Sequence, residues 1–354
     1  MRRQPGSHFQ EIASDAPKPR PWLRRSFRAL RVASIVAPWL FVGIVAWRAR
    51  PYYLDVASQG SLHAAAAMML LAIALLAFRR FLGAASYGLA ALVIAMLWST
   101  WARSPAALPV GTKGWMCLKL VHYNAFAHAS RHDDRFAAWL EAENPDIVVI
   151  VDSPWRYVDA QAWLAARYPY RIEPDPSFEW PMTVLSKLPL APASELFEFP
   201  TTDRSAIYSF TAQRAPALTL PDGQRILLSA MHPPSPRRER SWTASLRIAY
   251  REALLIHAWR EGTGLGVVLS GDCNSTPVGR VHRTFRMISG LTGWSTLLGS
   301  GTWPANYSPW ISIPIDRVWT SDEMVVRSLQ VGPQFASDHR PLVAEICIPP
   351  RNRE

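Results

Sequence analysis

The hydrophobic pattern divides the chain into an apolar N-terminal part and a mixed C-terminal part. Three apolar stretches, each close to the roughly 20 residues that cross a bilayer as a helix, occupy 29–47, 61–78 and 82–101. Only Arg31 interrupts the first stretch, near its start, where a long side chain can reach the interface. Aromatic residues that lie mostly near the ends of the stretches favour a membrane over buried core helices: Trp39, Trp47, Tyr52, Tyr53, Trp98 and Trp101. The pattern predicts a membrane anchor at 26–101 with three transmembrane helices.

After this anchor the pattern changes. Residues 102–114, which contain prolines and glycines, are typical of a linker. From residue 115 onward, short β-rich runs alternate with amphipathic ones. Strands are predicted at 115–122, 147–151, 183–185, 206–211, 225–230, 267–270, 315–320, 324–331 and 341–348, and helices at 132–143, 241–260 and 281–289. The alternation predicts an α/β domain over 115–354, long enough to bury a substantial core.

Charge adds an orientation to this picture. The first 31 residues hold eight basic and two acidic residues, so they carry more than half of the net charge of +11. We expect a disordered basic tail at 1–25 on the cytoplasmic side, together with the Arg79–Arg80 loop, while Arg48 and Arg50 are a weaker opposite signal. Three spans then place the domain outside the cytoplasm. In a bacterium the prediction is a multi-pass inner-membrane protein with a periplasmic domain.

The cysteines add little to the functional prediction. There are three, so at least one has no partner within the chain, and their spacing fits no zinc or redox motif. Cys117 and Cys347 lie on the first and last predicted strands of the domain and could be neighbours. We expect these two and Cys273 to be buried thiols.

Polar residues recur where predicted strands end. Carboxyl ends of strands are where α/β proteins usually place their chemistry, and carboxylates, amides and imidazoles there can bind a cation or move protons. Each residue alone has an ordinary explanation, such as a helix cap, a turn or a local ion pair. Their recurrence predicts a shared site made of Asn124, Asp152, His232, Asp272, Asn274, Asp316, Asp338 and His339.

The order of these motifs resembles the endonuclease/exonuclease/phosphatase superfamily, which has the deoxyribonuclease-I-like fold. The segments 271–277, 315–316 and 337–342 carry most of the resemblance, which extends from about 115 to 349. Three apolar stretches before the domain, with His-Pro-Pro-Ser-Pro at 232–236 and Gly-Thr-Trp-Pro at 301–304, look like a bacterial membrane-anchored subgroup. The resemblance implies a four-layer α/β/β/α sandwich, in which two mixed β-sheets are flanked by helices.

The resemblance also implies a reaction, the hydrolysis of a phosphodiester or phosphomonoester with Mg²⁺ or Mn²⁺. Asn124, Asp152 and Asp338 match residues on the metal side of the family's site, although the family places Glu where this chain has Asp152. The shorter side chain reaches less far, and Mg²⁺ tolerates misplaced ligands poorly. Metal affinity and activity therefore depend on how Asp152 is held.

The remaining matched positions are catalytic in the family. Asp272 matches the residue that orients or deprotonates the attacking water, and Asn274 matches a donor to the transition state. His232 matches a histidine that contacts the scissile phosphate. His339 matches the general acid/base, and Asp316 the carboxylate that fixes it, as in a catalytic triad.

Substrate and partners stay open at this stage. Lipid, sugar or inositol phosphate and nucleic acid are all phosphate esters, and a bilayer is the other predicted partner. The domain lacks a basic stripe long enough to favour duplex DNA, so a nuclease is an alternative, as is a non-catalytic envelope protein that only binds. Arg237, Arg238 and Arg240 either meet an anionic substrate or form a solvated loop, and Trp303 and Trp310 either line the pocket or pack under a loop.

Overall fold

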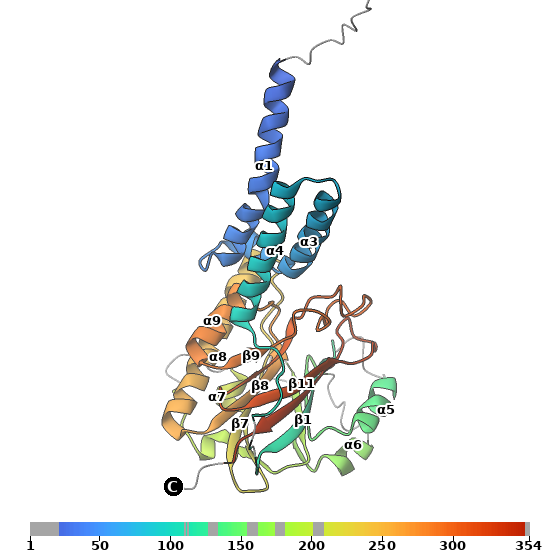
Figure 1. The fold of residues 1–354 in the computed structure, drawn as a ribbon. Helices are drawn as coiled ribbons and strands as arrows, with labels where there is room; N and C mark the ends of the chain where they lie inside the picture. The colour runs from blue at the N-terminus through green and yellow to red at the C-terminus, as the bar shows by residue number, and fades with distance from the viewer. Residues whose placement is uncertain are drawn as a thin grey trace, which may run out of the picture.

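The computed structural model describes residues 21–109, 111, 113–126, 134–153, 162–173, 181–200 and 209–350. Figure 1 shows apolar N-terminal helices standing on one end of an α/β body. The predicted disordered tail lies outside the described residues up to residue 20, and α1 (Pro21–Ala46) begins directly after it.

Two mixed six-stranded sheets form the body, with the strand orders β11-β12-β1-β2-β4-β3 and β5-β6-β7-β8-β10-β9 among the described residues. The first contains β1 (Met116–Asn124), β2 (Ile147–Val151), β3 (Tyr170–Ile172), β4 (Met182–Ser186), β11 (Val325–Val331) and β12 (Leu342–Ile348). The second contains β5 (Leu190–Pro192), β6 (Pro216–Thr219), β7 (Arg225–Met231), β8 (Gly266–Asp272), β9 (Thr292–Trp294) and β10 (Asp316–Thr320). β1 pairs with β2, and β7 with β8, in parallel, and their neighbours pair antiparallel.

The core lies between the sheets and continues under the helices. Leu120 and Val149 of the first sheet share one buried cluster with Leu228 and Val268 of the second. The outer face of the first sheet packs on α5 (Asp134–Glu143) and α6 (Ala162–Arg167). The outer face of the second sheet packs on α8 (Glu239–Thr263) and α9 (Arg280–Ser289), beside the short α7 (Phe210–Gln213). This arrangement confirms the predicted sandwich of two mixed sheets flanked by helices.

The local sequence explains why these helices and strands form, and it also explains one strand that was predicted wrongly. All five residues of β2 are apolar and buried, as expected for a strand covered on both faces. α8 and α9 both end at a glycine in the left-handed region, Gly264 and Gly290. The strand predicted at 206–211 is wrong at its described end, where Ser209 accepts a hydrogen bond from the Ala212 N–H and starts α7.

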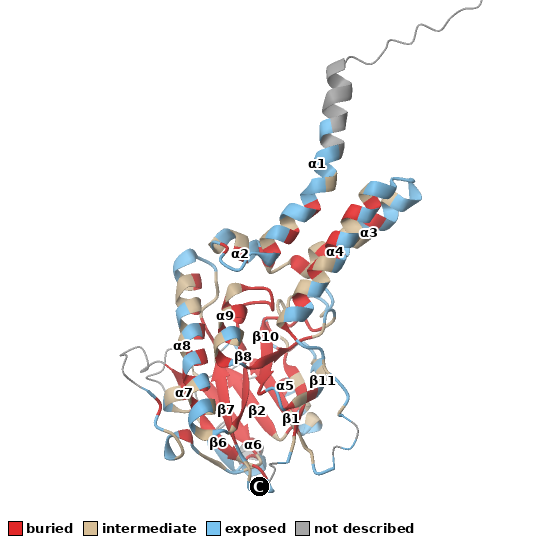
Figure 2. Cartoon of the chain, turned by 60° about the vertical axis from the view of Figure 1, so that its left-hand side comes forward, coloured by how far each residue is buried: buried red, intermediate tan, exposed pale blue. Residues whose placement is uncertain are grey.

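The N-terminal helices form a small bundle. α1, α3 (Ser61–Ala77) and α4 (Phe81–Trp101) meet through Val42, Ala65, Ala90 and Ile94. Figure 2 shows that much of the outer surface of these helices is exposed, whereas the strands of the body are buried. Their exposed side chains include large apolar ones such as Leu70.

The prediction of three membrane spans is not supported. Among the described residues, only α4 is by itself long and apolar enough to cross a bilayer. α2 (Tyr52–Ser58) and α3 would make a second span only if taken together, and they are bent by 58°. The apolar part of α1, Val32–Ala46, is shorter than a span. The apolar stretch predicted from the sequence, 29–47, ran past the end of α1 at Ala46. It also included Arg31, a charged residue that shortens the apolar part of the helix.

The expectation of three buried thiols is wrong for two cysteines. Cys117 of β1 lies directly opposite Cys347 of β12 in the antiparallel pair, and the two form a disulfide. The third, Cys273, is a buried free thiol whose pKa burial raises to about 12. A disulfide is typical of proteins that leave the reducing cytosol, so with the apolar helices it indicates a secreted or anchored protein.

Candidate active site

Polar side chains from separate strand ends converge on one pocket. Asn124 ends β1 and Asp272 ends β8, while Asp152 and His232 directly follow β2 and β7. The pocket has a volume of about 500 Å³. Seven of the eight residues singled out in the sequence line it: Asn124, Asp152, His232, Asp272, Asn274, Asp338 and His339. The eighth, Asp316, is buried behind His339.

Asp316 lies between two histidines. Its Oδ2 is 2.7 Å from His339 Nδ1, and its Oδ1 is 3.0 Å from His122 Nε2. Asp316 is fully enclosed, and burial opposes its charge, but the charges and hydrogen bonds of His339 and His122 outweigh burial and hold its pKa well below the usual range. Asp316 is therefore an anion that fixes the His339 ring and leaves Nε2 facing the pocket.

The same neighbours set the charge of His339. Burial by itself lowers its pKa, but the carboxylates of Asp316 and Asp272 outweigh burial and raise the pKa to about 9. Ser337 Oγ accepts a hydrogen bond from the His339 N–H and donates to the Asn124 carbonyl, so this loop is tied to the end of β1. At neutral pH, His339 is an imidazolium whose ring is fixed by Asp316, and it can donate a proton.

Asp272 lies at the centre of the site. Its Oδ1 accepts from the Asn274 N–H at 2.8 Å, and its Oδ2 accepts from Asn124 Nδ2 at 2.9 Å. The Nε2 atoms of His339 and His232 both lie 3.6 Å from the same Oδ2. Burial, reinforced by the charge of Asp316, raises the pKa of Asp272 and makes its carboxylate a better proton acceptor.

A glycine allows Asp272 to reach this place. A Cβ on Gly271 would lie 2.0 Å from the Met231 carbonyl oxygen, so the close approach of β7 and β8 requires glycine directly before the catalytic carboxylate. Two residues later Asn274 has φ 47°, a left-handed conformation that asparagine tolerates. Its Nδ2 donates to the Pro233 carbonyl and to Asp272.

Asp152 has a left-handed backbone as well, with φ 48°. Aspartate adopts this region several times more readily than most residues, so the backbone at the end of β2 suits the short carboxylate. Across the pocket, Asp338 accepts a hydrogen bond from Trp303 Nε1 at 3.1 Å and keeps a half-exposed carboxylate. Trp303 therefore lines the pocket, which is one of the two roles predicted for it from the sequence.

His232 is enclosed and has a different charge from His339. Burial lowers its pKa despite the nearby Asp272 carboxylate. The site therefore holds a neutral imidazole, His232, and a protonated one, His339, near Asp272 Oδ2. The neutral ring suits hydrogen bonding, and the protonated ring suits proton donation. Arg237 also lines the pocket, so it is available to an anionic substrate.

His122 is the main residue that the sequence did not single out. It lies in the interior of β1, where a buried histidine looks like a core residue. Alternation along a strand is the signal that could have found it, because residues two apart share a face. His122 therefore faces the same side as Asn124, toward the second sheet and Asp316.

The N-terminal segment supplies one wall of the pocket, which the sequence did not predict. Val56 of α2 and the adjoining Gln59 line it. Gln59 Oε1 accepts from the Thr276 N–H at 2.6 Å, in the loop that follows Asp272. A Cβ on Gly279 would lie 2.6 Å from Gln59 Nε2, so a larger residue there would displace the Gln59 side chain.

A buried ion pair holds α2 in this position. Asp55 bonds Arg50 at 2.8 Å, and it also accepts from Trp242 Nε1 and from the Arg280 N–H at the start of α9. Arg50 also donates to the Val278 carbonyl. Arg50 was one of the two arginines whose position argued against the predicted membrane orientation. It is fully buried and has a structural role, so it does not count as a charged loop residue in that prediction.

The donor set fits a hard divalent cation. Three carboxylates (Asp152, Asp272 and Asp338) and the side-chain oxygen of Asn124 line one pocket, and oxygen is the ligand that Mg²⁺ and Mn²⁺ prefer. Asp272, Asp316 and His339 also bring ligand atoms within 4.8 Å of one another and form a possible metal site. Within that cluster, Asp316 and His339 already bond each other.

A model of the Endonuclease/Exonuclease/phosphatase family matches residues 115–339, which is more than half of the chain. No curated protein sequence matches.

Three solved structures have a partial likeness to the chain. An endonuclease/exonuclease/phosphatase from Beutenbergia cavernae is 18% identical over 66% of this chain and 72% of its own, with a TM-score of 0.46. Truncated TDP2 from Caenorhabditis elegans is 17% identical over 65% and 97%, with a TM-score of 0.48. Sphingomyelinase C from Streptomyces griseocarneus is 16% identical over 65% and 99%, with a TM-score of 0.46. The roles of the pocket residues are drawn from their own geometry.

Proposed function

Since the chain belongs to the endonuclease/exonuclease/phosphatase family and is a phosphoesterase of that family, we propose that it hydrolyses a phosphate ester with a divalent metal and that Asp272 and His339 carry out the proton transfers. The observation that carries this proposal is the buried series His122–Asp316–His339, which points a protonated imidazole at the Asp272 side of the pocket. A water attacking the phosphorus in line loses its proton to Asp272. His339 Nε2–H donates to the oxygen that leaves.

The other residues hold these two or the substrate. His232, neutral and close to Asp272, donates to a non-bridging phosphate oxygen. Asn274 uses its amide to position Asp272, and its predicted role as a donor to the transition state needs one of the two Nδ2 bonds to open. Asn124 likewise orients the Oδ2 atom of Asp272.

Asn124, Asp152 and Asp338 are the residues that we assign to Mg²⁺ or Mn²⁺. All three line the pocket, and each offers an oxygen of the hard type. A bound divalent cation would neutralise the phosphate charge and stabilise the charge that develops during attack. The half-exposed Asp338 lies in the loop before β12, and the short Asp152 directly follows β2.

We also propose that the domain works outside the cytoplasm while α4 anchors it to a membrane. α4 is apolar over 21 residues, and the disulfide between β1 and β12 is stable in an oxidising compartment. We therefore assign the chain to the bacterial membrane-anchored subgroup that its sequence resembles, with the domain in the periplasm.

Substitution of the two proton-transfer residues tests the reaction. Asp272→Ala and His339→Ala should each lower the turnover of a chromogenic phosphate ester by about 10²–10⁴-fold, the range for loss of a general acid or base. Circular dichroism and melting temperature control for folding. Unchanged rates in either folded variant would contradict the proposal.

A further inference from the structure

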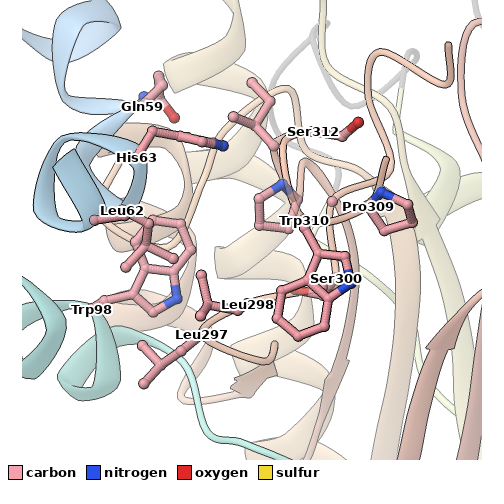
Figure 3. A pocket seen from close by; sticks show the side chains of 15 residues that line it. Gln59, Leu62, His63, Trp98, Leu297, Leu298, Ser300, Pro309, Trp310 and Ser312 are labelled. Atoms are coloured by element: carbon pink, nitrogen blue, oxygen red, sulfur yellow. The ribbon is translucent and has the colours of Figure 1, made fainter. Parts of the chain in front are cut away.

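A narrow crevice separates the N-terminal helices from the loop between β9 and β10. Leu62 and Ala66 of α3 and Trp98 of α4 line one side, and Leu298 and Trp310 of the loop line the other. Figure 3 shows Leu62 and Trp98 of the helices on one side of the space and Leu298 and Trp310 of the loop on the other. The crevice holds about 50 Å³, which admits a short piece of a single alkyl chain but not a ring system. Its lining is mostly apolar, so it is a poor place for a charged group.

The crevice adjoins the catalytic pocket. Gln59 and Ile313 line both spaces, so this pair of side chains forms the boundary between them. The pocket side is polar and carries the acid, the base and the proposed metal ligands. An elongated molecule with one polar and one apolar end therefore fits the pair of spaces in one orientation only.

The rim of the crevice is apolar and open. Ile311, next to the crevice, is 60% exposed, and the crevice-lining Trp310 and Leu298 are 65% and 55% exposed, although all are large hydrophobic residues. They lie beside the first turns of α3 and the last turn of α4, the helix that meets the requirements for a membrane span. Exposed apolar loops with tryptophan are typical of the interface of a bilayer.

We propose that the substrate is an amphiphilic phosphate ester taken from the bilayer around α3 and α4. Its phosphate lies against Asp272 and His339, and its alkyl chain passes between Gln59 and Ile313 into the crevice beside Leu298. This inference rests on the proposed function and adds the substrate class to it. Nucleic acid and free sugar phosphates lack the alkyl chain that the crevice accepts.

Two esters with the same reacting group test the proposal on the full-length protein in mixed micelles. Methyl para-nitrophenyl phosphate and hexadecyl para-nitrophenyl phosphate differ only in the chain. Burial of two methylenes is worth about 10-fold in kcat/KM, so we expect at least this preference for the hexadecyl ester. Ala66→Phe, which fills the crevice, should remove the preference and leave turnover of the methyl ester unchanged.

Ala67→Phe is the matched control, because Ala67 is exposed on the same helix but does not line the crevice. It should keep the preference of the unsubstituted protein. The proposal is overturned if the hexadecyl ester has no advantage, or if Ala66→Phe preserves the advantage. Failure of the unsubstituted protein to hydrolyse either ester would instead overturn the proposed function, and this inference with it.

Discussion

Asp316 is a buried carboxylate shared by two histidines, and only one of them faces the pocket. His122 is fully buried and bonds the oxygen that His339 leaves free. A buried anion is costly unless its lone pairs are satisfied, so His122 stabilises the charge that in turn orients His339. His122 does not line the pocket, and we regard it as a positioning residue.

Replacement of His122 should therefore affect rate more than substrate binding. We expect His122→Phe to lower kcat by about 10-fold with little change in KM, because a hydrogen bond to a charged group contributes about 1.5–3 kcal/mol. His122→Gln, which can still donate to Asp316, should restore much of the rate. A purely structural role would instead lower the melting temperature of both variants equally and give no rescue by glutamine.

Asp152 should control metal affinity. Because its carboxylate is one of few oxygen donors in the pocket, Asp152→Ala should weaken Mn²⁺ binding by about 10-fold or more, measured by calorimetry or electron paramagnetic resonance. Asp222→Ala is the control, since Asp222 lies in the exposed turn before β7, at the far end of that strand from the site. Equal affinities in the Asp152 and Asp222 variants would show that Asp152 is not a ligand.

The candidate site could largely be predicted at the scale of residues because its members lie at or beside strand ends and form short polar motifs. His122 could not be recognised in that way, since it is inside a strand and its partner Asp316 is 194 residues away. The disulfide was missed for a related reason. Strand pairing decides that Cys117 and Cys347 face each other, and a sequence with three cysteines does not specify the register.

At the scale of elements, the short helix α2 connects the apolar N-terminal helices to catalysis. Gln59 bonds the backbone of the loop that carries Asp272 and Asn274, and Asp55 bonds the start of α9. The helix has only seven residues and no strong periodicity, so its docking depends on partners from distant parts of the chain. The sequence pattern indicated an anchor and a separate domain, whereas the structure joins them at the pocket.

Loss of the Gln59 contact should loosen the catalytic loop. Gln59→Ala leaves the Thr276 N–H without its acceptor, which costs about 1–3 kcal/mol, so we expect faster hydrogen exchange at Thr276 and a several-fold lower kcat. Tyr53→Ala is the control because Tyr53 is exposed on the same helix. If Gln59→Ala changes neither exchange nor kcat, α2 is only a spacer.

At the scale of the whole molecule, an α/β domain was predictable because buried apolar strands alternate with amphipathic helices, and the family resemblance implied its two sheets. The number of membrane spans was not, because apolar letters do not show where a helix ends or bends. The disulfide joins the first and last strands of the α/β body, and the apolar helices stand at the end of the body where the pocket opens. This layout agrees with a hydrolase that acts at a membrane surface outside the cytoplasm.

The most direct test of the account is the metal dependence of hydrolysis by the full-length protein. Turnover of bis(para-nitrophenyl) phosphate would be measured after removal of metal with a chelator, then after addition of Mg²⁺ or Mn²⁺, beside His339→Ala. The account predicts no turnover without metal, recovery with at least one of the two ions, and no recovery in His339→Ala. Turnover that survives the chelator, or a folded protein that is inactive with both ions, would contradict it, and the second result would favour a non-catalytic binding protein.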